Sequence, residues 1–188
     1  MTITVLDSLS RRMRAMHSLW EDAVASMTVA QVNHVERTGV LPIAFSLFHF
    51  TDIEDGSVAI LGGPAPTWDE TWAQRVGLVI NDNGKARTVE EMSEQQIGDY
   101  NAFRDYQRTV FDKTEKWLAT LDDAALDEVI IRRPFPEQIA STYSARVARE
   151  DGMRRLDAIE CWIYQHGLRH MGEVEHARAL VGLRGMTS

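Results

Sequence analysis

The sequence predicts an all-α protein, a four-helix bundle with a long connection before its last helix. Two observations predict this class. Apolar residues recur every three or four positions in four long segments. Glycine, proline and polar clusters of the kind that end helices separate these segments. The order of helix directions is left open between an up-down-down-up and an up-down arrangement.

The first two predicted helices cover residues 8–27 and 41–61. Leucine, methionine and tryptophan residues fall on one face of the first helix, and Asp7 is its expected N-cap. The second helix begins near Pro42, which suits a first helical turn. It is apolar nearly all round, so we expect other helices to bury it.

The third predicted helix covers residues 88–121 and begins with a capping box between Thr88 and Glu91. Residues 127–136 follow as the long connection, and two prolines with three β-branched residues make that stretch extended.

The last predicted helix begins at residue 147 or 151 and ends near Val181, because Gly182 suits a helix C-terminus.

Composition limits the class of protein. With 188 residues and 44% hydrophobic content, we expect a single domain over residues 1–188. A net charge of −8 argues against a nucleic-acid partner. The single cysteine, Cys161, is expected to be a buried, inert thiol and fits a reducing compartment. Neither a signal-peptide layout nor an apolar run of about 20 residues is present, so we expect a cytoplasmic protein without a membrane partner.

His166 and His170 lie four residues apart in the last predicted helix. Residues at this spacing share one helix face, one turn apart. Two imidazoles placed in this way can bind one transition metal at about 2.0–2.1 Å. Glu173 shares the face, bulky apolar residues border it, and His176 lies off it. The pair therefore predicts a metal site, but the same spacing is also common in helices that bind no metal.

His49 is the candidate for a third ligand because it lies in the apolar second helix. Asp52 shares its face and could bind the metal or hold an imidazole by its second nitrogen. Three histidines with open positions filled by water form a catalytic type of site. Such a metal can polarise a carbonyl or lower the pKa of water or of a thiol. A zinc-protease motif is excluded because Gly167, not glutamate, follows His166.

The end of the chain resembles the DinB-like superfamily of four-helix-bundle proteins. Its signature is His-x-x-x-His-x-Gly-Gln/Glu, then a leucine- and arginine-rich end and a glycine. The chain reads His166-Gly-Leu-Arg-His170-Met-Gly172-Glu173 and continues to Gly182.

The second predicted helix carries the other half of the resemblance. The family's first histidine ends a motif of bulky residues and is followed by acidic ones, as His49 is by Asp52 and Glu54. The resemblance covers nearly the whole chain and is strongest at residues 41–54 and 162–182.

The resemblance implies that His49, His166 and His170 bind one divalent ion, most often nickel or zinc. Known relatives include S-transferases that use low-molecular-weight thiols such as bacillithiol or mycothiol, and a mycothiol-dependent maleylpyruvate isomerase. We therefore expect a metal-dependent enzyme of transferase, isomerase or hydrolase type that acts on a small molecule, and a homodimer. Glu173 departs from the family, where glutamine is common, and makes the site more anionic.

The remaining candidates are expected to pack or to face solvent. Trp68, Trp72 and Trp162 are first of all core residues, but they also qualify as walls of a ligand pocket. His17 and His34 are expected to be solvated or to cap helices.

Two alternatives to an enzyme stay open. A non-catalytic binding or stress-related module with a degenerate metal site is favoured by the lack of a recognisable general base. A protein that dimerises through exposed apolar helix faces is favoured by the strongly apolar second helix.

Overall fold

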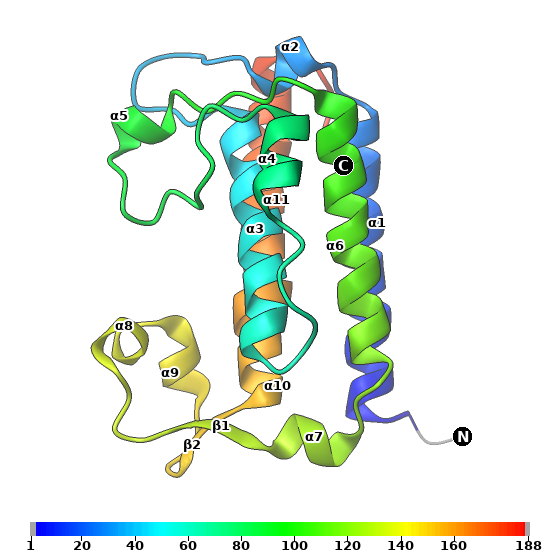
Figure 1. Cartoon of the computed structure of the whole chain (residues 1–188), viewed down its shortest axis with the longest axis vertical. Helices are drawn as coiled ribbons and strands as arrows, with labels where there is room; N and C mark the ends of the chain where they lie inside the picture. Colours follow the sequence, from blue (N-terminus) through cyan, green and yellow to red (C-terminus); the bar gives the residue numbers. More distant parts are fainter. Residues whose placement is uncertain (1–2, 187–188) are drawn as a thin grey trace.

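Four long helices lie side by side along the longest axis of the molecule (Figure 1). The computed structural model of the chain describes residues 3–186. The first three long helices are α1 (Val5–Ala25), α3 (Ile43–Ile60) and α6 (Tyr100–Leu118). The fourth is continuous through α10 (Arg155–Ala158), a π-helical segment η1 (Ile159–Tyr164) and α11 (Gln165–Leu180). In Figure 1, α1 and α11 run toward one end of the bundle, and α3 and α6 run toward the other. The predicted all-α bundle is confirmed.

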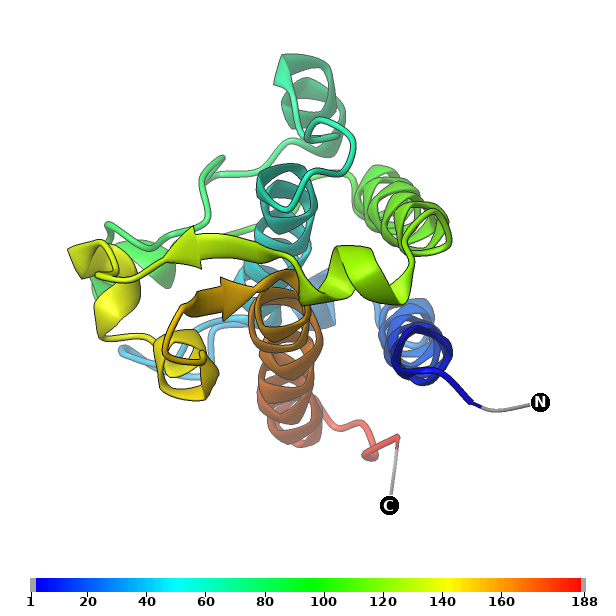
Figure 2. The same ribbon diagram turned by 90° about the horizontal axis from the view of Figure 1, so that it is seen from below.

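Short elements connect the long helices. The helical ones are α2 (Val29–Val32), α4 (Glu70–Val76), α5 (Val89–Met92), α7 (Asp123–Asp127), α8 (Glu137–Ala140) and α9 (Tyr143–Val147). Two strands, β1 (Val129–Arg132) and β2 (Gly152–Arg154), pair antiparallel. This small sheet crosses the end of the bundle at which α10 begins (Figure 2).

The predicted helix over residues 88–121 is wrong in its first half. The capping box at Thr88 is present, but it begins only the single turn α5. The long helix α6 begins later, after Asp99, whose side chain caps it. Between them Gly98 donates a backbone hydrogen bond to Gly77, 3.1 Å away, so that pairing with a distant segment interrupts the helix.

Two helix starts also differ from the prediction. Thr4, not Asp7, caps α1, and its hydroxyl accepts from the backbone N–H of Asp7 at 3.1 Å. The last helix begins at Arg155 and not at 147 or 151, because the preceding residues pair with β1. Gly152, with φ of +145°, allows the chain to enter that pairing.

The core lies between the four long helices. α3 packs against both α11 and α6, and α1 packs against α6. Residues are buried on all sides of α3, as its sequence predicts, whereas α1 buries one face. Over the described part of the chain, residues 3–186, no helix is both long and apolar enough to span a membrane.

Asp55, buried on α3, fixes the loop of residues 61–69 against the bundle. One of its oxygens accepts from the backbone N–H groups of Thr67 and Trp68, at 2.7 and 2.8 Å. The other pairs with the ammonium of Lys113 on α6. A buried carboxylate supplied with these partners orders the loop and joins α3 to α6.

Candidate metal centre

Three imidazoles converge between α3 and α11, and we call His49, His166 and His170 the histidine centre. One ring nitrogen from each side chain lies within 4.8 Å of the others. The Nε2 atoms of His166 and His170 are 3.0 Å apart. Helix α3 supplies the first side chain and the start of α11 supplies the other two. The structure therefore brings together the three histidines singled out in the sequence.

The outer ring nitrogens of two of these histidines are tied to acceptors. Nδ1 of His49 lies 2.5 Å from the backbone carbonyl of Asn83. Nδ1 of His170 lies 2.6 Å from Oε2 of Glu173. Because a carbonyl or carboxylate oxygen only accepts, each Nδ1 carries the proton, and each Nε2 presents a lone pair to the centre.

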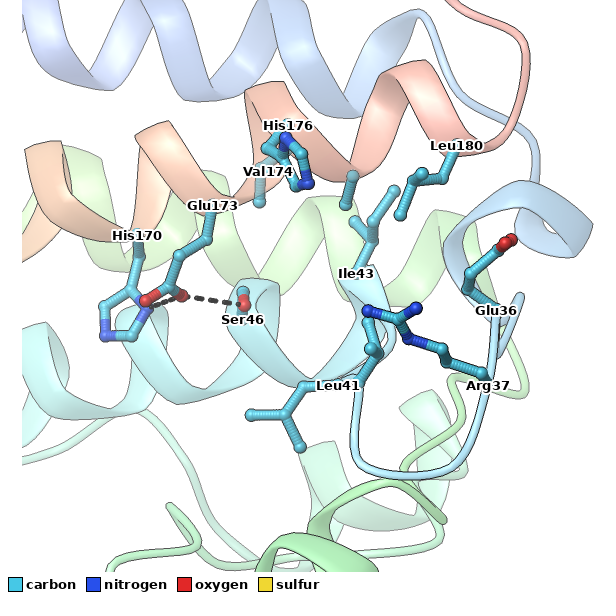
Figure 3. Close-up of a pocket in the computed structure, with 12 residues that line it drawn as sticks. Glu36, Arg37, Leu41, Ile43, Ser46, His170, Glu173, Val174, His176 and Leu180 are labelled. Carbon is cyan, nitrogen blue, oxygen red and sulfur yellow. Dashed lines mark hydrogen bonds and ion pairs between the residues drawn. The ribbon is translucent and has the colours of Figure 1, made fainter.

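Glu173 has two partners, which fix its carboxylate beside His170. Besides His170, its Oε2 accepts from the hydroxyl of Ser46 on α3 at 3.3 Å (Figure 3). The hydrogen bond with His170 holds the pKa of Glu173 below its usual range. A carboxylate on the second nitrogen of an imidazole is the arrangement that orients metal-ligating histidines.

The three imidazoles are half-buried, and burial favours the neutral form of His49 and His166. Burial lowers the pKa of His49. Burial, with the charges of His170 and His49, lowers the pKa of His166 to about 2. The buried Nδ1 of His166 has no hydrogen-bond partner among the residues that the structure describes. Neutral imidazole is the form that binds metal, so protons compete little for His49 and His166.

This donor set fits a divalent transition ion. The Nε2 lone pairs of His49 and His170 face one another across the centre, an arrangement that a cation stabilises. Neutral imidazole nitrogens suit zinc, nickel, copper and iron, whereas calcium and magnesium require oxygen ligands. Three protein ligands leave further coordination positions for water or substrate.

The comparisons with known proteins identify the family and the fold of this chain. A family model described as the DinB superfamily matches residues 12–174. The chain belongs to the DinB superfamily. No curated protein matches its sequence. A crystal structure of a conserved protein from Enterococcus faecalis is similar over 96% of this chain and 99% of that one, with a TM-score of 0.74 and 18% identity. At that identity the likeness shows a shared fold.

A π-helical segment directly precedes the two histidines of α11 in this DinB-superfamily bundle. η1 spans Ile159–Tyr164, and such wide turns inside α-helices are frequent at functional sites. Gly167 then packs so closely that a Cβ would lie 2.4 Å from the sulfur of Met16 and 2.8 Å from the ring of Phe50. Glycine at this position lets α11 approach α1 and α3, which brings its histidines toward His49.

Asp52 lies one turn beyond His49, and its predicted contact with an imidazole is replaced by a contact through Asn83. The backbone carbonyl of Asn83 holds His49, and the Asn83 side chain interacts with Asp52. Burial raises the pKa of Asp52 to about 6, although Asn83 lowers it in part. A carboxyl with this pKa can take up and release a proton near neutral pH.

A cavity of about 420 Å³ borders the histidine centre on the side of Glu173 (Figure 3). His170, Glu173 and Ser46 form its inner end, whereas His49 and His166 are not among its lining residues. The cavity therefore lies beside the centre and not over it. Its apolar walls are Val40, Leu41, Ile43, Val174, Ala177 and Leu180.

The tryptophans predicted as pocket walls have other contacts. The rings of Trp68 and Trp72 pack on Tyr106 of α6, with centroids 4.8 and 5.7 Å away. Neither lines the cavity beside His170. Trp162 lies in η1, and its indole N–H donates to the hydroxyl of Ser144 at 3.0 Å. The structure gives Trp68 and Trp72 a packing role because Asp55 holds their loop on the α6 side.

His17 is buried, which corrects the expectation that it is solvated. Its Nδ1 lies 2.9 Å from Oε1 of Glu115, and its Nε2 lies 3.0 Å from Oε1 of Glu54, the latter a close ion pair without hydrogen-bond alignment. Burial alone would lower the pKa of His17, but the two carboxylates outweigh it and raise the pKa. We call His17, Glu54 and Glu115 the His17 cluster.

Sequence reasoning missed the role of His17 although a signal was present. His17 follows Met13 by four residues and precedes Trp20 by three, so it falls on the buried face of α1. By contrast, no sequence pattern indicates that the carbonyl of Asn83 meets His49. Cys161 is buried as expected, and burial raises its pKa to about 11, which suits an inert thiol.

Proposed function

We propose that this DinB-superfamily protein is a metal-dependent enzyme that acts on a small molecule, of thiol S-transferase, isomerase or hydrolase type. His49, His166 and His170 would hold one divalent ion, nickel or zinc. One observation supports this most: three ring nitrogens converge, and acceptors on the outer nitrogens of His49 and His170 direct their lone pairs inward. A site built only for structure would be closed by a fourth protein ligand.

A bound metal would supply Lewis acidity, which lowers the pKa of a coordinated water or thiol. The protein's own groups would do the rest. Glu173 and the Asn83 carbonyl keep His170 and His49 in the tautomer and orientation that ligation requires. Asp52, with its pKa raised to about 6, is the candidate to accept the proton that such a water or thiol releases.

The cavity beside His170 supports a small organic substrate or cosubstrate. Its volume of about 420 Å³ lies in the range of ordinary ligand pockets, and its walls are mostly apolar. A low-molecular-weight thiol is the cosubstrate that membership of the superfamily favours.

Metal content is the direct test of the centre. Protein purified without added metal and dialysed against metal-free buffer should carry about one equivalent of nickel or zinc per chain, measured by elemental analysis. His166→Ala should remove it. His176→Ala is the matched control, because His176 is exposed on the same helix and outside the three converging side chains. Equal metal content in the two variants would refute the site.

Turnover separates an enzyme from a binding module. Metal-loaded protein should consume a small thiol together with an electrophilic cosubstrate, and removing the metal should abolish this. Asp52→Asn should lower the rate and leave the metal content unchanged, since Asp52 is not among the three converging side chains. If the metal raises the melting temperature but no thiol, ester or isomerisable substrate is turned over, the non-catalytic module is the correct function.

A further inference from the structure

The cavity beside the histidine centre has charged groups of opposite sign at its two ends. At its inner end lies the carboxylate of Glu173, whose Oε2 accepts from both Ser46 and His170. Because both contacts fall on one oxygen, Oε1 has no hydrogen-bond partner within residues 3–186. At the other end lies Arg37, the one lysine or arginine among the lining residues that the structure describes (Figure 3). Between the two ends the walls are apolar.

The segment between α2 and α3 fixes the backbone of Arg37 at the mouth of this cavity. Asn33 anchors the start of the segment, because its side-chain amide exchanges two hydrogen bonds with the backbone of Ile97, at 3.0 and 2.9 Å. A turn follows, in which the N–H of Val40 donates to the carbonyl of Arg37 at 3.1 Å. Gly39, with φ of +83°, supplies the left-handed conformation that such a turn requires. The side chain of Arg37 therefore starts from an ordered turn.

The guanidinium of Arg37 has no acidic partner within residues 3–186, since neither a side-chain hydrogen bond nor an ion pair reaches it. The carboxylate of the neighbouring Glu36 points in another direction (Figure 3). It lies 3.2 Å from Nε2 of His34, which holds it away from the guanidinium. The Arg37 side chain is exposed and lines the cavity, so its donors are open to a ligand.

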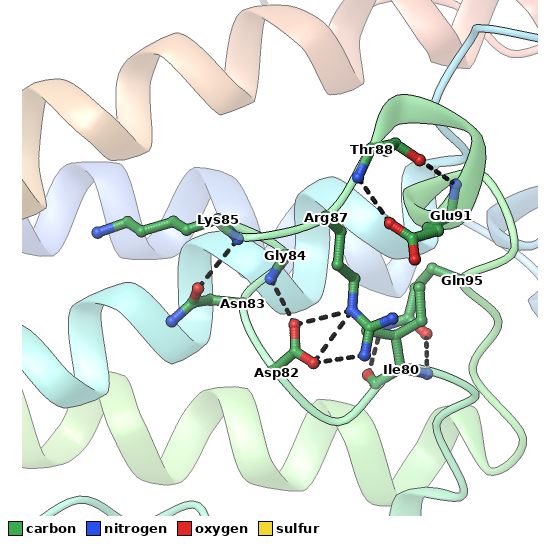
Figure 4. A network of polar contacts seen from close by, with 9 residues as sticks. All are labelled: Ile80, Asp82, Asn83, Gly84, Lys85, Arg87, Thr88, Glu91 and Gln95. Atoms are coloured by element: carbon green, nitrogen blue, oxygen red, sulfur yellow. Dashed lines mark hydrogen bonds and ion pairs between the residues drawn. The ribbon is translucent and has the colours of Figure 1, made fainter.

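Arg87 shows how the chain occupies an arginine that it uses for structure. On the loop of residues 80–95, its guanidinium forms a two-pronged pair with Asp82, with contacts of 3.0 and 2.6 Å (Figure 4). Arg37 lacks such a partner, although the chain carries 28 acidic residues. A planar guanidinium with free donors binds a carboxylate through two parallel hydrogen bonds. The ligand that best replaces the missing partner of Arg37 is therefore a carboxylate.

The two ends and the walls together specify the ligand and its direction. Apolar walls favour a hydrocarbon body. An acid group is repelled at the inner end by Glu173 and attracted at the outer end by Arg37. Because the chain has a net charge of −8, an anion is stabilised only where a cation lies close to it.

We infer that the cavity binds a small apolar carboxylic acid, with its carboxylate on Arg37 and its opposite end beside His170. That this ligand is the substrate rests on the proposed function. The inference narrows the substrate to an acid whose reacting group lies at the end remote from the carboxylate. Arg37 determines specificity here: it selects for the negative charge and takes no part in holding the metal.

Three ligands with the same chain provide the test. Hexanoate, hexan-1-ol and hexylamine carry a negative, no and a positive charge at pH 7. Each is titrated into the isotope-labelled full chain, and the amide shifts of its NMR spectrum give both affinity and location. Hexanoate should bind about fivefold more tightly than hexan-1-ol, the upper value for an ion pair that water still reaches. Hexylamine should bind most weakly, and the shifts should include Val174 and Leu180 of the cavity wall.

Variants assign the preference for the acid to one side chain. Arg37→Gln should remove the preference and leave the affinity for hexan-1-ol unchanged, whereas Arg37→Lys should retain part of it. Arg146→Gln is the matched control, because Arg146 is an exposed arginine on α9, at the other end of the bundle (Figure 1). Ala177→Phe adds bulk to the cavity wall and should weaken the binding of all three ligands.

A metal-free variant separates Arg37 from the histidine centre, since a carboxylate can also bind a metal ion. His166→Ala, which should carry no metal, should still prefer hexanoate. If the preference is lost in His166→Ala and kept in Arg37→Gln, the acid binds the metal, which overturns the role of Arg37 and supports the metal centre.

The other outcomes are equally distinct. Equal binding of hexanoate and hexan-1-ol, tightest binding of hexylamine, or affinities unchanged by Ala177→Phe overturn the inference and leave the metal centre intact. If the wild type carries no metal but shows a preference that depends on Arg37, the proposed function fails and the cavity remains a site for a small acid.

Discussion

The bundle holds two histidine clusters, and the pKa values of their imidazoles shift in opposite directions. In the histidine centre, burial lowers the pKa of His49 and His166, and the inner nitrogens are free to bind. In the His17 cluster, carboxylates on both ring nitrogens raise the pKa despite deeper burial. The groups on the ring nitrogens, more than burial itself, thus decide whether the pKa of a buried histidine rises or falls.

The largest expected effect is a loss of stability, and we expect it from the His17 cluster only. His17→Ala leaves Glu54 fully buried without its counter-charge, so we expect a loss of about 3–5 kcal/mol in the free energy of unfolding. Urea unfolding followed by circular dichroism measures this loss. Metal content per folded chain should not change. A loss of metal equal to that in His166→Ala would show that the two clusters are coupled.

Glu173→Gln should lower the metal affinity of the histidine centre and leave the fold intact. The substitution removes the charge that His170 faces at 2.6 Å, and changes to such orienting partners lower metal affinity by about 10- to 100-fold. Competition with a chromophoric zinc chelator measures the affinity. Ser46→Ala is the milder comparison, because it removes only the 3.3 Å contact to the same carboxylate. Unchanged affinity in Glu173→Gln would mean that His170 is oriented by packing alone.

The smallest effect is a pH dependence confined to the His17 cluster. The folded-state pKa of His17 is raised above its unfolded value of about 6.5. Its stabilising contribution is therefore complete below about pH 6.5 and is lost as pH rises through the folded pKa. The difference in unfolding free energy between metal-free wild type and His17→Ala should shrink as the pH rises above about 6.5. A constant difference would show that His17 stays neutral in the folded protein.

The two clusters also differ in how far the sequence reveals them. The histidine centre could be predicted because the spacing of His166 and His170 and the apolar surroundings of His49 are local properties. His17 lies on an equally regular face of α1, and that periodicity could have shown that it is buried. Its partners could not be predicted, because they come from other helices.

Contacts between distant segments account for the other errors. The capping box at Thr88 correctly marks a helix start, but local capping does not determine length, and the pairing of Leu78 with Ile97 ends that helix early. The Asn83 carbonyl meets His49 only because the loop folds back on α3. Every residue type carries the same backbone carbonyl, so the sequence does not indicate which one will contact His49.

The π-helical turn of η1 lets the last helix absorb a change of one residue in chain length. Deleting one residue within Ile159–Tyr164 would allow the turn to close into ordinary α-helix. Because the wide turn holds one residue more than α-helix does over the same rotation, His166 and His170 would still face α3. A second deletion would find no wide turn to close, and it would rotate both histidines by about 100° and shift them by about 1.5 Å along the axis. Metal binding should therefore survive the first deletion and be lost with the second, although every ligand is still present in the sequence.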